Sequence, residues 1–132
     1  MRKNFYLFDT HALIFWRRRQ SVPDEFIKFF DKQNDLGNLY VSSISFWEIA
    51  LLAKKGKIKV DDLQAWKDET IANSNLTEIM PTASEMIKSV QLPDLHKDPF
   101  DRLLITQAIN KNATIVTKDK IIEKYPVLVY RI

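Results

Sequence analysis

Short apolar segments alternate along the chain with longer segments of helical character, and this alternation restricts the fold more than any other feature. Residues 5–8 form a continuous apolar run, as in a strand that is buried on both faces. Similar strand candidates follow at 39–42, 76–80, 113–117 and 127–130. Helical segments lie between them, at 10–19, 23–32, 44–55, 62–73, from 82 onward and at 98–110. This order predicts an α/β domain with a mostly parallel sheet of four to five strands and right-handed crossovers.

Length and composition exclude several classes of protein. With 132 residues, the chain is expected to form a single domain over 1–132. Its 45% hydrophobic and 28% charged residues are ordinary for a globular protein and exclude a disordered one. The absence of cysteine excludes disulfides, thiolate metal sites and cysteine nucleophiles. Two glycines leave no room for a glycine-rich phosphate loop.

The charge balance is compatible with a polyanionic partner but does not require one. The chain carries a formal charge of +3, and a mild basic excess of this kind is common. No apolar run approaches the roughly 18 residues of a membrane span. Asp9 interrupts the apolar stretch behind Arg2 and Lys3 too early for a secretory signal. We therefore expect a cytoplasmic protein without a membrane partner.

Acidic side chains fall where the predicted strands end. Asp9 directly follows the first strand, and Asp119 follows the strand at 113–117. Glu48 lies about one turn into the helix after the second strand, whereas Asp98 and Asp101 occupy the first turn of a later helix. Crossover helices run antiparallel to the strands, so their first turns lie at the carboxyl edge of the sheet, where α/β proteins bind ligands. Four separate segments therefore bring carboxylates to one edge.

Such a group of acids favours a divalent cation. Neighbouring carboxylates repel one another and raise each other's pKa unless a positive charge lies between them. Oxygen ligands suit Mg²⁺ or Mn²⁺ rather than zinc, and such an ion can polarise a phosphodiester for hydrolysis. Asp9 supports this interpretation most strongly, because an acid at the end of a buried strand needs a partner or a metal.

Each of the other acids also has a purely structural interpretation. Asp98 precedes a proline and fits a helix N-cap, which would make Asp101 the third helical residue, where an acid favours the helix dipole. Ser45 and Glu48 have the spacing of a capping box. Asp119 fits the cap of a short helix that follows it. The convergence of these residues on one edge favours a functional site.

Four segments of the chain resemble the motifs of PIN-domain ribonucleases, especially VapC-type toxins of bacterial toxin–antitoxin pairs. They occur in the family's order and span nearly the whole chain, at 7–14, 41–50, 95–105 and 114–119. The resemblance implies a three-layer α/β/α fold and an endoribonuclease that depends on Mg²⁺ or Mn²⁺. It also implies a cognate antitoxin whose peptide segment blocks the site, and a homodimer.

The same resemblance assigns roles to individual residues. It makes Asp9, Glu48, Asp101 and Asp119 the catalytic and metal-binding acids. Asp101 is preferred to Asp98 as the third acid because it stands closest to an apolar helical run, and Asp98 is the second choice. Three hydroxyl residues match positions that support the metal or water, namely Thr10, Ser43 and Thr117.

Several expectations remain open at this stage. An inactive PIN-like module that binds protein or RNA is the alternative function, and the RNA that is cut cannot be identified. His11 and His96 are expected to be supporting or surface groups, and Trp47 to point inward. The helices at 23–32 and 62–73 are candidate dimer surfaces. A haloacid-dehalogenase-like phosphatase is excluded, because it needs a second acid where this chain has His11.

Overall fold

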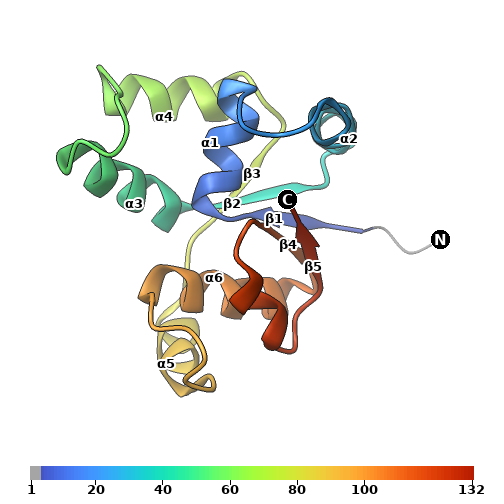
Figure 1. Ribbon diagram of the computed structural model, residues 1–132, viewed down its shortest axis with the longest axis vertical. Coiled ribbons are helices and arrows are strands. Elements are labelled where there is room, and N and C mark those ends of the chain that lie inside the picture. The colour runs from blue at the N-terminus through green and yellow to red at the C-terminus, as the bar shows by residue number, and fades with distance from the viewer. Residues whose placement is uncertain (1–3) are drawn as a thin grey trace.

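The computed structural model describes residues 4–132 as a five-stranded sheet with helices on both faces (Figure 1). Arg2 and Lys3 lie outside the described residues. Within residues 4–132, no helix has the length and apolar composition needed to cross a bilayer. The elements are β1 Tyr6–Phe8, α1 Thr10–Arg18, α2 Asp24–Asp35, β2 Leu39–Ser42, α3 Ser43–Lys54, α4 Leu63–Ala72, β3 Thr77–Ile79, α5 Ala83–Gln91, α6 Pro99–Lys111, β4 Thr114–Thr117, the 3₁₀ helix η1 Lys120–Lys124 and β5 Val129–Arg131.

All four strand pairs of the sheet are parallel, in the order β3-β2-β1-β4-β5. The first strand is central, and Phe8 lies opposite Val41 of β2 and Val116 of β4. The backbone N–H of Asp9 continues the ladder by donating to the carbonyl of Val116, at 3.0 Å. The predicted parallel α/β sheet is confirmed, and its strands end at a common edge.

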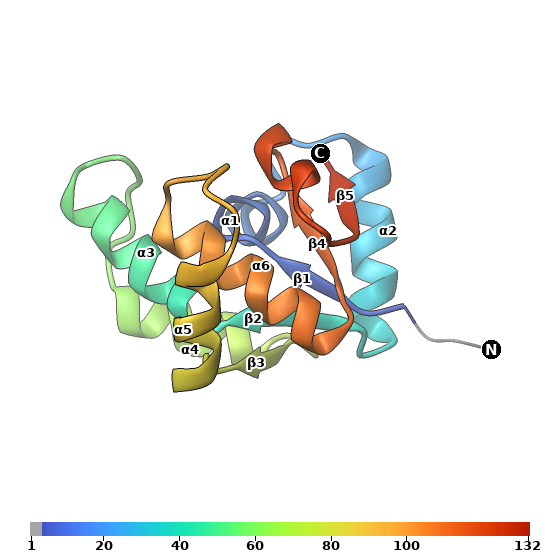
Figure 2. The ribbon, with the colours of Figure 1, turned by 90° about the horizontal axis from the view of Figure 1, so that it is seen from below.

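Alternate residues of each strand pack against opposite helical layers, so the core is divided by the sheet. Phe8 and Val116 pack into a cluster with α1 and α2, whereas Leu7 and Ile115 pack into another with α6. In Figure 1, α1, α2 and α4 lie on one side of the sheet and α5 and α6 on the other; the view from below in Figure 2 has α5 and α6 in front of the strands. The three-layer α/β/α arrangement is therefore confirmed.

Two predictions about α3 are wrong. The helix begins at Ser43, and the Ser42 side chain accepts from the Ile44 N–H at its N-terminus, so Ser45 and Glu48 do not form a capping box. Trp47 does not point inward, as its 61% exposure shows. The strand that precedes α3 ends directly at the helix, and this sets the helical phase by which Trp47 faces outward. By contrast, Thr82 and Glu85 form a capping box at the start of α5.

The packing of Phe30 gives a test of the first core cluster. Its fully buried ring contacts those of Phe8, Phe26 and Tyr130, with centroids 4.7–5.2 Å away. We expect Phe30→Ala to lower the free energy of unfolding by about 3–5 kcal/mol, since a cavity replaces the ring. Leu36→Ala is the control, because Leu36 is 56% exposed. Urea denaturation measures both variants, and equal losses would contradict this packing.

Candidate metal centre

Asp9 stands where β1 ends and α1 begins. Its Oδ1 accepts the backbone N–H of Ala12 at 2.7 Å, which caps the helix, and it also accepts a hydrogen bond from the Thr117 hydroxyl. The residue is only 5% exposed. Burial raises the pKa of Asp9, although these two hydrogen bonds oppose the shift. One acid of the predicted set is therefore held rigidly in a poorly hydrated position.

Glu48 reaches the same region from α3. The Thr10 hydroxyl donates to its Oε1 at 2.5 Å, and Ser45 Oγ lies 3.2 Å from that hydroxyl. These contacts tie the second turn of α3 to the start of α1. Within residues 4–132, no side-chain hydrogen bond joins Ser43 to the acidic residues, so the serine that contacts this network is Ser45.

The first turn of α6 supplies two acids in different situations. Asp98 is the N-cap, as its structural interpretation predicted, and its Oδ1 accepts the backbone N–H of Phe100 at 2.9 Å. Asp101 is partly buried, and its side chain is 17% exposed. The pKa of Asp101 is raised to about 8. Burial is the main cause, and repulsion by four carboxylates contributes, those of Asp98, Asp9, Glu48 and Asp119.

Asp119 follows β4 and caps η1. Its Oδ1 accepts the backbone N–H of Ile121 at 2.9 Å, and its own N–H donates to Thr117 Oγ1 at 3.0 Å. Partial burial acts to raise the pKa of Asp119, but hydrogen bonds from Ile121 and His96 outweigh it and hold the pKa below its usual range. Thr117 therefore contacts both Asp9 and Asp119.

These side chains line one cavity, here called the acidic cleft, with a volume of about 460 Å³. All five acids singled out in the sequence meet there. The cleft is lined by Asp9, His11, Phe15, Glu48, His96, Asp98, Asp101, Lys118 and Asp119.

His96 is closer to the acids than the sequence indicated. Its Nε2 lies 2.6 Å from Asp119 Oδ2 and 3.1 Å from Asp101 Oδ2. Ligand atoms of these three residues lie within 4.8 Å of one another, as around a metal ion. The only signal in the sequence was the position of His96 two residues before Asp98. His11 also lines the cleft and is exposed.

The donor set fits a hard divalent cation. The acidic cleft offers carboxylate oxygens from four separate segments, and Mg²⁺ and Mn²⁺ prefer such ligands. A cation at this position would offset the burial and the carboxylate repulsion that together raise the pKa of Asp101. Asp9, Glu48, Asp101 and Asp119 are the residues that could hold it.

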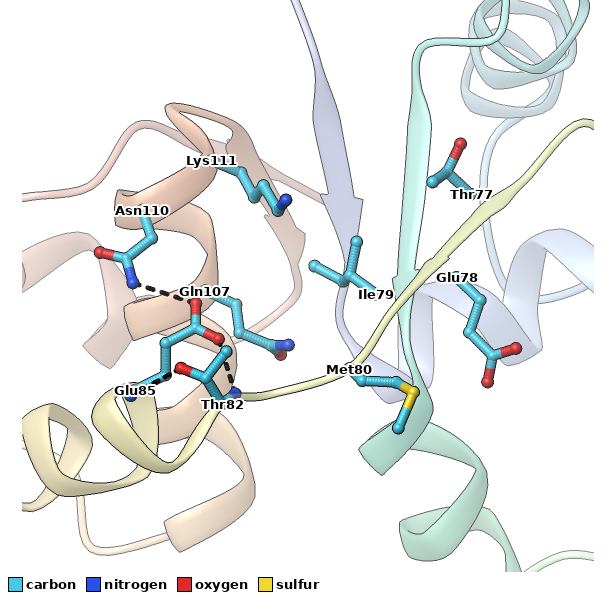
Figure 3. Close-up of a pocket in the computed structure, with 9 residues that line it drawn as sticks. All are labelled: Thr77, Glu78, Ile79, Met80, Thr82, Glu85, Gln107, Asn110 and Lys111. Atoms are coloured by element: carbon cyan, nitrogen blue, oxygen red, sulfur yellow. Dashed lines mark hydrogen bonds between the residues drawn. The ribbon is translucent and has the colours of Figure 1, made fainter.

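A second cavity, of about 520 Å³, lies between β3 and the α5–α6 pair (Figure 3). There, the Glu85 carboxylate accepts from the Thr82 N–H and from Asn110 Nδ2, so both of its oxygens are used. The buried amide of Gln107 has no partner among the described residues. This cavity has no converging set of carboxylates, so the metal-binding chemistry belongs to the acidic cleft.

Comparisons with known proteins agree with this geometry. The PIN domain family profile matches residues 6–128. No curated protein matches the chain in sequence. Solved structures with a similar fold include three complexes. They are DNA-bound VapBC from Salmonella typhimurium (TM-score 0.72, 17% identity, covering 98% of each chain), VapBC2 from Rickettsia felis bound to a promoter DNA fragment (0.71, 20%, 96% of this chain and 98% of that one) and FitAcB from Neisseria gonorrhoeae (0.64, 17%, 96% and 97%).

The raised pKa of Asp101 predicts how stability changes with pH in the metal-free protein. Between pH 3.8, the ordinary pKa of an aspartate, and about pH 8, the folded protein holds a proton that the unfolded chain releases. Stability therefore falls as pH rises through this window. We expect Asp101→Asn to remove this loss and to raise the free energy of unfolding at pH 8 by about 2 kcal/mol.

Chemical denaturation in the presence of a chelator, at pH 5 and pH 8, measures this effect. The control is Asp61→Asn, since Asp61 is an exposed acid outside the cleft. If Asp101→Asn were no more stable than the parent at pH 8, the carboxylate would not be strained by its surroundings.

Proposed function

Since the chain belongs to the PIN domain family, we propose that it is a divalent-metal-dependent endoribonuclease and the VapC-type toxin of a type II toxin–antitoxin pair. The observation that carries the proposal is the convergence of five carboxylates in the acidic cleft, with Asp101 too desolvated to ionise readily without a cation. The proposed substrate is RNA, whose phosphodiester bonds such a site could hydrolyse, and the proposed location of the activity is the cytoplasm.

Four acids are proposed to hold Mg²⁺ or Mn²⁺, namely Asp9, Glu48, Asp101 and Asp119. Asp101 is favoured over Asp98 because four other carboxylates act on it and because its ligand atom lies within 4.8 Å of those of His96 and Asp119. Thr10 and Thr117 orient two of these acids through their hydroxyl groups. Ser43 is the least supported of the three hydroxyl residues, because the serine that contacts Thr10 beside Glu48 is Ser45.

The proposed chemistry is hydrolysis of the RNA backbone. When bound, the ion supplies positive charge that polarises the phosphodiester and stabilises the leaving oxygen. Asp101 releases its proton when the ion binds, and it then contributes a full negative charge as a ligand. Lys118 lines the cleft and adds positive charge where a phosphate would enter.

A cognate antitoxin is the proposed protein partner. The similar VapBC and FitAcB structures are two-component complexes by their names. The acidic cleft would attract a cationic side chain from a peptide segment of such a partner. A segment held there would exclude both the ion and the RNA, and the toxin would be silent until it was released.

We also propose that the protein forms a homodimer through its apolar α3–α5 face. Large apolar side chains are exposed there, those of Trp47, Met86, Ile87 and Val90. A small apolar groove of about 250 Å³ between α3 and α6 adjoins them. On the helices expected from the sequence, α2 and α4, Trp66 is instead partly buried against the core. The α3–α5 face is therefore the better candidate.

The alternative is a PIN-like module that binds a partner without cutting RNA. Such a protein would keep the fold, but it would gain nothing from a buried Asp101 whose ionisation is suppressed. The acidic cleft therefore favours the nuclease, and RNA cleavage distinguishes the two functions.

The nuclease proposal predicts metal-dependent cleavage of RNA by protein freed of its antitoxin. We expect cleavage of labelled structured or single-stranded RNA with Mg²⁺ or Mn²⁺ and none with a chelator. Asp9→Asn should lower the rate at least 100-fold, because it removes a charged ligand. Asp24→Asn is the matched control, since Asp24 lies at the start of α2 outside the cleft. If RNAs of several kinds survive and no ion binds, the nuclease proposal is wrong.

The dimer proposal predicts that a charge on the α3–α5 face separates the subunits. Val90 is 76% exposed, so Val90→Asp should leave the fold intact but bury an unpaired charge in the interface. We expect a change from dimer to monomer, or a dimer weakened at least tenfold, in light scattering coupled to size exclusion. Leu128→Asp, at another exposed apolar position, should not change the mass. A monomeric parent protein would contradict the proposal.

A further inference from the structure

One buried side chain, that of Arg102, holds the segment that joins α5 to α6. A guanidinium has five N–H donors, and here every one of them meets a backbone carbonyl. Nε donates to Ser89 at 3.0 Å, Nη2 to Val90 at 3.1 Å and Leu92 at 2.7 Å, and Nη1 to Pro93 at 3.1 Å and His96 at 2.9 Å. Such complete use of the donors fixes the path of the segment.

Tyr125 holds the same segment from the other side. Its buried hydroxyl donates to the Pro93 carbonyl at 2.7 Å and accepts the N–H groups of Leu95 at 3.2 Å and His96 at 2.8 Å. The hydroxyl also lies 3.5 Å from Arg102 Nη1. The backbone of His96 is therefore bound at its carbonyl by Arg102 and at its N–H by Tyr125.

The hydrogen bonds of the His96 ring determine which nitrogen carries its proton. Nδ1 accepts the backbone N–H of Asp98 at 3.1 Å, so in the neutral ring this nitrogen is unprotonated. The proton is then on Nε2, the atom that lies 2.6 Å from Asp119 and 3.1 Å from Asp101. Nε2 therefore donates to Asp119, lies beside Asp101 and has no free electron pair for an ion.

We propose that Arg102 and Tyr125 are positioning residues that present His96 as a hydrogen-bond donor of fixed tautomer. His96 orients Asp119 through this hydrogen bond and is not itself a ligand, despite its closeness to Asp119 and Asp101. The inference rests on the proposed function, since it concerns the same metal centre. Groups that orient metal ligands in this way affect metal affinity by about 10–100-fold.

Two spectroscopic measurements test the role of His96 directly. The chain has two histidines, so the His11→Gln variant leaves His96 as the only imidazole. In the ¹⁵N spectrum of this metal-free variant in mildly alkaline buffer, we expect the proton on Nε2. In pulsed EPR with Mn²⁺ bound, we expect no directly coordinated nitrogen. A proton on Nδ1, or a strong nitrogen coupling that His96→Gln abolishes, would overturn the inference.

Binding measurements test the two positioning residues. Tyr125→Phe removes the hydroxyl alone, and we expect it to weaken Mn²⁺ binding about tenfold in calorimetry. His96→Ala should weaken binding further, and His96→Gln should recover part of the loss, since its amide can donate in place of Nε2. Tyr130→Phe is the control, because Tyr130 packs in the core beside Phe30, away from the cleft. Unchanged affinity in Tyr125→Phe and His96→Ala would overturn the inference.

These results can be told apart from failure of the proposed function. A protein that binds Mn²⁺ as described but cuts no RNA contradicts the nuclease proposal and leaves the role of His96 supported. Metal-dependent cleavage together with a coordinated nitrogen contradicts only the role of His96. If no ion binds, the nuclease proposal fails, and the ¹⁵N spectrum of the metal-free protein still decides the tautomer. Arg102→Lys provides a second variant, which retains the charge but cannot make five hydrogen bonds.

Discussion

Electrostatic repulsion inside the acidic cleft is the constraint on which the rest of the structure depends. Asp9 and Asp101 are withdrawn from water and share the cleft with three further carboxylates. Both have raised pKa values, chiefly because burial disfavours the charged form. The fold must offset this cost, and it does so with a close-packed parallel sheet, aromatic packing around Phe30 and dense hydrogen bonding of the segments that carry the acids.

Three acids of the cleft also cap helices, and two of them, Asp9 and Asp119, are among the proposed metal ligands. Asp9, Asp98 and Asp119 each give one oxygen to a backbone N–H at the start of a helix. The second oxygen is left for other contacts, as Asp119 Oδ2 shows by accepting from His96. For Asp98 and Asp119, capping and ligation were competing explanations in the sequence. The two roles are compatible, because a carboxylate fixed by a cap has already lost the rotamer freedom that ligation would cost.

The parts of the fold that follow from local periodicity were predictable. Each strand was located to within a residue or two, because the apolar runs are short and bounded by polar residues. The five acids could be brought together from the sequence because parallel strands share one carboxyl edge. The orientation of Trp47 could not be predicted, since it depends on a helical phase that is set by where β2 stops. The place of His96 could not be predicted either. It depends on hydrogen bonds between its backbone and the side chains of Arg102 and Tyr125, which the periodicity of the sequence does not reveal.

An arrangement this costly favours catalysis over passive binding. A binding module could replace Asp101 by asparagine and lose the repulsion of four carboxylates. The chain instead retains the acid in a position where it ionises only near pH 8 without a cation. It also commits all five donors of a buried arginine to the neighbouring segment. Strain of this kind is useful where a cation relieves it, because the ion is then bound by groups that are already in place.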